Sequence, residues 1–168
     1  RTGVYKCDAK GKVTSISTEP GQNSAIFSGN FKQLMLTHHS AATPPTYTLR
    51  NDKGKVQKTL QDNAALKQKI DGMNLAKIEF FQFQTQDGVD LNGIMVKPAD
   101  FDANKKYPVI LYQYSGPGSQ QVLDSWYAGN CSAALLERYM AQEGFVSVIV
   151  DGRGTGGRGA EFEKAINR

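Results

Sequence analysis

Two glycine-rich segments carry the residue types that could take part in chemistry, and each directly follows an apolar run. The first is Gln113-Tyr114-Ser115-Gly116-Pro117-Gly118-Ser119-Gln120. The second is Asp151-Gly152-Arg153-Gly154-Thr155-Gly156-Gly157-Arg158-Gly159. In a parallel α/β sheet, catalytic and ligand-binding groups gather at the carboxyl ends of the strands. If both apolar runs are such strands, these two segments are where a site belongs.

Tyr114 is the residue of the first segment whose chemistry fits a catalytic role. A phenol hydroxyl can donate a hydrogen bond to an oxyanion that develops during acyl transfer, without changing its own charge. In hydrolases built on such a sheet, the loop between the third strand and the first helix supplies one of the two oxyanion donors. The competing interpretation is a space-filling aromatic at a strand end, because half-buried tyrosines are common in strands.

The second segment formally matches a dinucleotide-binding fingerprint, Gly154-x-Gly156-x-x-Gly159, and its arginines could meet phosphate. However, Asp151-Gly152-Arg153 separates the apolar run from the pattern, whereas the fingerprint begins at the tight turn itself. The other interpretation is a turn whose glycines permit positive φ and close backbone packing. A nucleotide-binding α/β domain that uses residues 154–159 therefore remains an alternative function.

The sequence around these segments predicts the opening of an α/β sheet. Strands are expected over residues 77–85 and 91–98, joined through the hairpin signal Gln86-Asp87-Gly88. The runs 107–114 and 145–150 contain stretches without polar alternation, which is typical of strands buried on both faces. Hairpin, apolar strand, helix and apolar strand in this order favour an α/β sheet.

The helix in that order is expected over residues 132–143. Its apolar residues recur on one face, which should pack on the sheet, and Gly144 follows where a C-terminal cap belongs. The members of this face are Leu135, Leu136, Tyr139 and Met140.

The first part of the chain instead contains short strands separated by turn residues. The expected strands are 3–8, 12–18, 25–28, 33–39, 46–50 and 55–60. This spacing predicts an antiparallel meander from a sandwich, a barrel or a propeller, and a propeller needs several blades to close. A short helix over residues 64–73, with Asn63 as its N-cap, would connect the two parts.

Charge and metal-ligand spacing exclude several function classes. The formal net charge is +4, but the 20 Lys and Arg are scattered among 16 Asp and Glu and lack interleaved aromatics, which argues against nucleic-acid binding. Cys7 and Cys131 have no CxxC spacing. His38 and His39 are adjacent, so in a strand they point to opposite sides and cannot easily share a metal. We expect no metal and no cofactor.

Four blocks of the sequence stand out together: Lys105-Lys106-Tyr107-Pro108-Val109-Ile110-Leu111, Tyr114-Ser115-Gly116-Pro117-Gly118-Ser119-Gln120, Asp151-Gly152-Arg153-Gly154-Thr155-Gly156 and Ala165-Ile166-Asn167-Arg168. In order and spacing, they resemble the prolyl oligopeptidase family of serine peptidases, specifically its dipeptidyl peptidase IV branch. Residues 45–49 and 62–66 extend the likeness, more loosely, towards the first part of the chain.

The resemblance implies a mixed fold in three parts. Residues 1–63 would be the C-terminal strands of a β-propeller, and residues 64–74 a connecting helix. Residues 75–168 would be the N-terminal portion of an α/β-hydrolase catalytic domain. The chain is then expected to be an internal fragment that stops before the nucleophile.

The implied activity is release of N-terminal Xaa-Pro or Xaa-Ala dipeptides from peptides by acyl transfer. Tyr114 matches the family's oxyanion-hole tyrosine, and the second glycine-rich segment matches a structural loop. The nucleophile motif Gly-x-Ser-x-Gly does not occur in this sequence. The triad follows the order Ser, Asp, His, so His38 and His39 cannot belong to it. The isolated chain is therefore expected to be inactive.

Further expectations concern partners and location. The resemblance implies peptide substrates, a homodimeric parent protein and a periplasmic or secreted location. An uncovered apolar strand edge predicts self-association or strand exchange of the chain. A non-enzymatic, β-rich interaction module is the remaining alternative.

Overall fold

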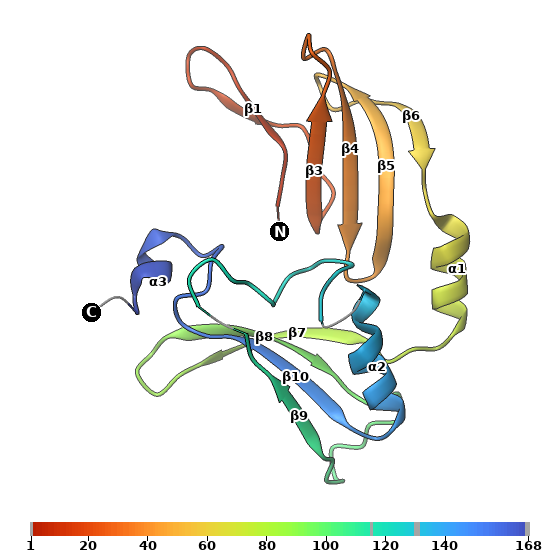
Figure 1. Cartoon of the computed structure of the whole chain (residues 1–168), viewed down its shortest axis with the longest axis vertical. Helices are drawn as coiled ribbons and strands as arrows, with labels where there is room; N and C mark the ends of the chain where they lie inside the picture. Colours follow the sequence, from red (N-terminus) through yellow and green to blue (C-terminus); the bar gives the residue numbers. More distant parts are fainter. Residues whose placement is uncertain (1, 115, 130–131, 167–168) are drawn as a thin grey trace. The chain divides into compact units, whose positions relative to one another are not determined.

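The chain forms two compact units. The computed structural model describes residues 2–114, 116–129 and 132–166 (Figure 1). Unit 1 comprises Arg1–Gly72 and Asp124–Trp126, and unit 2 comprises Met73–Leu123 and Tyr127–Arg168. Four residues used in the sequence analysis lie outside the described residues: Ser115, Cys131, Asn167 and Arg168.

Unit 1 is built on a four-stranded antiparallel sheet in the order β3-β4-β5-β6 (Figure 1). The strands are β3 (Gln22–Phe27), β4 (Gln33–Ser40), β5 (Thr43–Asn51) and β6 (Val56–Gln61). A separate hairpin of β1 (Tyr5–Cys7) and β2 (Val13–Ser15) precedes it. Because each strand of the larger sheet pairs with its neighbour in sequence, the predicted antiparallel meander is confirmed.

The core of unit 1 contains the buried side chains of the central strand β4. Leu34 and Leu36 alternate with more exposed residues, and they are 1% and 0% exposed. Ile16 packs in the same cluster. Burying a leucine side chain contributes about 1.5–3 kcal/mol, so these few residues supply much of the apolar stabilisation of this unit.

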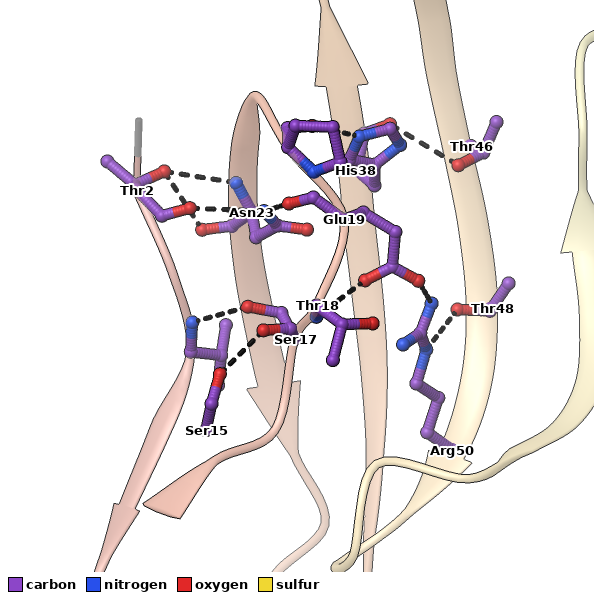
Figure 2. A network of polar contacts seen from close by, with 12 residues as sticks. Thr2, Ser15, Ser17, Thr18, Glu19, Asn23, His38, Thr46, Thr48 and Arg50 are labelled. Carbon is purple, nitrogen blue, oxygen red and sulfur yellow. Dashed lines mark hydrogen bonds and ion pairs between the residues drawn. The ribbon is translucent and has the colours of Figure 1, made fainter. Parts of the chain in front are cut away.

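Polar contacts join the segment before β3 to the rest of unit 1 (Figure 2). The Arg50 guanidinium, on β5, donates to Glu19 Oε1 at 2.5 Å and to Thr48 Oγ1 at 2.9 Å. Asn23 donates through its side chain to the carbonyl oxygens of Glu19 and Thr2. Burial acts to raise the pKa of Glu19, but the Arg50 hydrogen bond and backbone N–H groups lower it overall. The Glu19 carboxylate is thus held in its charged form against Arg50.

The predicted connecting helix is present as α1 (Ala64–Gly72), but Asn63 does not cap it through its side chain. The Asn63 side chain donates to the Pro45 carbonyl at 2.6 Å, so this tertiary contact holds it away from the helix N-terminus. Instead, Asp62 Oδ1 accepts the Ala64 N–H at 3.0 Å. Only the Asn63 carbonyl joins the helix, accepting from the Lys67 N–H.

Unit 2 is built on a four-stranded sheet in the order β7-β8-β10-β9. The strands are β7 (Ile78–Gln84), β8 (Asp90–Val96), β9 (Val109–Tyr112) and β10 (Val146–Asp151). β7, β8 and β10 pair antiparallel, whereas β9 and β10 run parallel. The predicted hairpin and the start of an α/β sheet are therefore confirmed, and the fold is a propeller-like antiparallel segment followed by the opening of a hydrolase sheet.

Helix α2 (Leu135–Gln142) follows the short 3₁₀ turn η1 (Ser132–Ala134) and contacts β10 and β8. Its predicted cap is confirmed, because the Gly144 N–H bonds to the Ala141 carbonyl and the Phe145 N–H to the Met140 carbonyl. Gly144 has a φ of 84°, which favours glycine.

The predicted apolar face of α2 turns inward only in part: Leu136 and Met140 line a cavity together with residues of β9 and β10, but most of the face is exposed. Leu135 and Leu136 are 44% exposed and Tyr139 is 57% exposed, whereas Glu137, Arg138 and Ala141 are buried. At about 100° per residue these two sets lie on opposite sides of the helix. The small Ala141 side chain allows the helix to approach the sheet. Glu137 lies so close to Gly129 that a Cβ there would fall 2.6 Å from Glu137 Oε2. Tertiary contacts therefore override the apolar pattern.

The prediction that both apolar strands are buried on both faces holds for only one of them. β10 lies between β8 and β9, and Val146 and Ile149 are 7% and 2% exposed. β9 is the edge strand, and Val109 and Leu111 are 62% and 65% exposed. The difference arises because β9 has a neighbouring strand on one side alone in the described part of the chain.

Two further observations concern membrane-spanning helices and thiols. Across the described ranges, no helix combines the length and the apolar character that crossing a membrane requires. Cys7 is an exposed free thiol.

Candidate functional site

The two glycine-rich segments meet at one edge of the unit 2 sheet. β9 and β10 are parallel neighbours, with Val146 paired to Val109 and Ile149 to Tyr112. Their carboxyl ends therefore lie at the same edge. The Gly156 N–H donates to the Ser119 carbonyl at 2.9 Å, which joins the two loops directly. This parallel pairing is the condition under which the sequence predicts that the two loops share one location.

Tyr114 is displayed at this edge rather than packed in the core. It follows β9 after one intervening residue, and its side chain is 64% exposed. An aromatic that fills space at a strand end would be mostly covered. The geometry thus disfavours the space-filling interpretation and leaves the phenol accessible to a ligand.

The loop that carries Tyr114 folds back on its own backbone. The Ser119 hydroxyl contacts the Gly116 carbonyl at 2.8 Å and the Tyr114 carbonyl at 3.3 Å. The Ser119 N–H also donates to the Gly116 carbonyl, at 3.1 Å. Gly118 has a φ of 76°, so a glycine is required for the turn. The loop is a closed turn with Tyr114 at its start.

Asp151, the last residue of β10, anchors the far end of this loop. Its Oδ1 accepts the Gln121 N–H at 2.8 Å, and its Oδ2 accepts the Val122 N–H at 3.0 Å. Asp151 is 3% exposed, and Val122 belongs to the unit 2 core. The carboxylate is thus a buried clamp between β10 and the loop after β9.

Both arginines of the second loop bind other groups of the protein. Arg153 forms an ion pair with Asp87, and Arg158 donates to the Asp90 carbonyl while its guanidinium lies 4.0 Å from the Phe162 ring centroid. Hydrogen bonds from Thr85 and then from Arg153 lower the pKa of Asp87 to about 2. These contacts tie the loop to the β7–β8 hairpin region, which supports a structural role.

The geometry gives little support to a nucleotide site at residues 154–159. Gly154 and Gly157 have φ values of 80° and 82°, and a Cβ on either would clash, with Ile166 or with Gln120. These glycines are explained by close packing. The helix that follows, α3 (Ala160–Lys164), has five residues, which is short for a phosphate-binding helix N-terminus. Of the three fingerprint glycines, Gly154 is the one explained by such packing, so the case against a nucleotide site rests on Gly154, on the engaged arginines and on the short helix.

His38 and His39 lie in unit 1, on β4, and have different partners. His38 Nε2 lies 2.7 Å from the Pro20 carbonyl oxygen, while His39 Nδ1 accepts the Trp126 N–H at 3.2 Å. Burial, followed by the charge of His38, lowers the pKa of His39 despite an opposing effect of Asp124. Both histidines are half-buried. Among the described residues, no His, Cys, Asp and Glu side chains cluster with a metal-binding arrangement.

Sequence reasoning missed two residues that shape the Tyr114 loop. In the sequence Asp151 stands out only as part of the glycine-rich pattern, and Glu163 has no predicted role. Glu163 Oε1 accepts the Gly118 N–H at 3.1 Å. For Asp151 a signal existed, because an acidic residue directly after an apolar strand sits where backbone N–H groups need acceptors. For Glu163, 45 residues from its partner, no local signal exists.

Comparison with known proteins identifies the family. The sequence profile of the prolyl oligopeptidase family matches residues 133–168. A probable dipeptidyl peptidase 4 of Aspergillus flavus is 33% identical over 148 residues, covering 86% of this chain and 18% of that protein. A dipeptidyl peptidase 4 of Arthroderma otae is 33% identical over 152 residues, covering 89% of this chain and 19% of that protein.

Solved structures give the same result. The crystal structure of Porphyromonas gingivalis dipeptidyl peptidase 4 matches with a TM-score of 0.88 and 44% identity, covering 97% of this chain and 22% of that one. A putative dipeptidyl aminopeptidase IV from Bacteroides ovatus matches with a TM-score of 0.77 and 29% identity, covering 94% and 22%.

The chain therefore belongs to the prolyl oligopeptidase family of serine peptidases, as the sequence blocks predicted. Within that family its similarity is to the dipeptidyl peptidase IV branch. It spans about a fifth of the length of these relatives.

Proposed function

We propose that this chain supplies the oxyanion-stabilising tyrosine, Tyr114, of a serine-type dipeptidyl peptidase. The observation that carries the proposal is the exposed phenol of Tyr114 at the carboxyl end of β9. The loop behind it is tied to β10 through Asp151 and Gly156. A hydroxyl on an anchored loop suits the stabilisation of a negative charge that appears only during reaction.

The proposed reaction is acyl transfer at the second peptide bond of a peptide substrate. The serine nucleophile attacks the carbonyl carbon, a histidine takes its proton, and the carbonyl oxygen becomes an oxyanion. Tyr114 donates a hydrogen bond from its hydroxyl to that oxygen and keeps its proton, while the peptide C–N bond breaks and the leaving amine takes the proton held by the histidine. The relatives are dipeptidyl peptidases by name, which supports peptides as substrates. We propose penultimate Pro or Ala, following the family resemblance.

The test is a Tyr114→Phe substitution in the complete peptidase that carries this chain. Removing one oxyanion donor costs about 100- to 1000-fold in kcat. KM for a Gly-Pro chromogenic substrate should change little, because the hydrogen bond strengthens only in the transition state. Tyr139→Phe is the matched control, since Tyr139 is a similarly exposed tyrosine on α2, and it should retain activity. A Tyr114→Phe enzyme within about threefold of the parent would overturn the proposal.

We also propose that the 168-residue chain has no peptidase turnover by itself. Its sequence contains no Gly-x-Ser-x-Gly motif, so it offers no serine on a nucleophile elbow. Purified chain incubated with the Gly-Pro substrate should release product at the rate of the buffer blank. Turnover that a serine-directed phosphonate abolishes would contradict this.

Association between copies of the chain is a further part of the proposal. β9 lies at the edge of its sheet and carries exposed Val109 and Leu111, and an apolar strand edge is a template for pairing with another chain. A second copy of this chain is the partner we propose, and the complete peptidase is proposed to be a homodimer.

A further inference from the structure

We infer that Asp151 is a positioning residue for Tyr114: it fixes the loop that places the phenol at the oxyanion. This inference rests on the proposed function and goes beyond it, because it assigns a role to a residue that does not meet the substrate. It also gives the loop after β10 a place in the reaction.

The surroundings of Asp151 are those of a clamp. The residue ends β10, where it pairs with Asn92 of β8, so its backbone is held within the sheet. Each of its carboxylate oxygens accepts a different backbone N–H, one from Gln121 and one from Val122. A carboxylate bound through both oxygens cannot rotate without losing one bond. At 3% exposure the Asp151 side chain is itself shielded from water, and its bond to Val122 is fully buried while that to Gln121 is partly buried.

A short path of contacts leads from this clamp to Tyr114. The clamp fixes residues 121–122, and the Gly156 N–H holds the carbonyl of nearby Ser119. The Ser119 hydroxyl in turn contacts the Tyr114 carbonyl at 3.3 Å. On its other side Tyr114 is fixed by β9, where Tyr112 is in register with Ile149. Contacts with β10 and with the loop that follows it thus hold the chain on both sides of the catalytic tyrosine.

Precise placement matters because an oxyanion donor works over a narrow distance. A misplacement of about 1 Å can cost on the order of 100-fold in rate. Asn at position 151 keeps one acceptor oxygen but presents an NH₂ group to the second backbone N–H, so donor faces donor. The loop would then lose one of its two anchors on β10 while the size of the side chain stays the same.

Glu163 provides a second, weaker hold on the same loop. It accepts the Gly118 N–H from α3, and its contact is exposed to solvent. A water molecule can replace such a contact at low cost, whereas the buried contacts of Asp151 have no such substitute. The inference therefore concerns Asp151.

The experiment is a double-mutant cycle in the complete peptidase that carries this chain. Asp151→Asn and Tyr114→Phe are made singly and together, and kcat and KM are measured with the Gly-Pro substrate. We expect Asp151→Asn to lower kcat about 10- to 100-fold with KM within about threefold. If Asp151 acts through the Tyr114 hydroxyl, the same change should cost less than about threefold in the Tyr114→Phe background.

Asp102→Asn is the matched control. Asp102 also accepts a backbone N–H through its carboxylate, from Asn104 at 2.9 Å, but it lies in an exposed turn away from the two loops. It should leave kcat unchanged in both backgrounds. Amide hydrogen exchange supplies a structural readout, since Asp151→Asn should speed exchange at Gln121 and Val122 but not within β10.

Ser119→Ala covers the case in which Asp151→Asn does not fold. It removes the hydroxyl contact with Tyr114 without altering a core residue, and it should show the same loss in kcat, again absent in the Tyr114→Phe background. Equal losses in both backgrounds, for whichever variant folds, would overturn the inference while leaving the proposed function intact. A Tyr114→Phe enzyme with normal kcat would overturn the proposed function instead.

Discussion

β4 in unit 1 and β9 in unit 2 both contain an apolar run, yet the side chains of the two runs are buried to very different extents. Leu34 and Leu36 on β4 are 1% and 0% exposed, whereas Val109 and Leu111 on β9 are 62% and 65% exposed. β4 has a paired strand on each side, and β9 ends its sheet. The comparison teaches that an apolar run predicts a strand, whereas the position of that strand in the sheet decides whether its apolar side chains are buried and contribute to stability.

The largest expected effect is a difference in the free energy of unfolding between a substitution on β4 and one on β9. Leu36→Ala should lower the free energy of unfolding of unit 1 by about 2–5 kcal/mol, because it leaves a cavity among fully buried side chains. Leu111→Ala should change the stability of unit 2 by less than about 0.5 kcal/mol, because the side chain already faces solvent. Urea denaturation monitored by far-ultraviolet circular dichroism measures both, and the fluorescence of Trp126 follows unit 1. Similar losses for the two variants would break the comparison.

An intermediate effect concerns association through the edges of the two sheets. β9 exposes Val109 and Leu111, and we expect the chain to self-associate there. Leu111→Lys should lower the weight-average mass measured by light scattering, because a charge on the edge opposes pairing. β6, the edge strand of unit 1, already carries Lys58 beside the exposed Leu60. Leu60→Lys should therefore leave the mass unchanged, and a monodisperse monomer in the parent chain would refute the prediction.

The smallest effect is a pH dependence confined to unit 1. Burial and the charge of His38 lower the pKa of His39 below 6.5. A depressed pKa means that the folded state binds fewer protons than the unfolded state, so stability rises with pH in this window. The contribution is complete above about pH 6.5 and is lost as the pH falls through the lower pKa of the folded state.

Trp126 reports on this titration, since it is the only tryptophan and its backbone N–H donates to His39 Nδ1. Fluorescence followed from about pH 8 to pH 5 should show a transition below 6.5, because a protonated Nδ1 cannot accept. The transition should vanish in His39→Gln. In His38→Gln it should persist and move to higher pH, because the neighbouring charge that lowers the pKa of His39 is removed. An unchanged transition in His39→Gln would assign the effect to another group.

Much of the fold was predictable because it depends on local rules. Turn residues located the strands, and the glycines at 88 and 144 marked a hairpin and a helix end, where they adopt φ values of 82° and 84°. The position of Tyr114 after β9 followed from the same reading of strand ends. The family blocks then gave this position a proposed chemical role.

The sequence by itself therefore determined which segments are strands and helices and that the two glycine-rich loops follow β9 and β10. The tertiary structure decided which face of α2 turns inward and which apolar strand stays exposed, because periodicity shows which residues share a face but not what that face meets. It also decided the partner of Asp151, whose bonds to Gln121 and Val122 cross 30 and 29 residues of sequence. Only the parallel pairing of β9 with β10 brings those groups together.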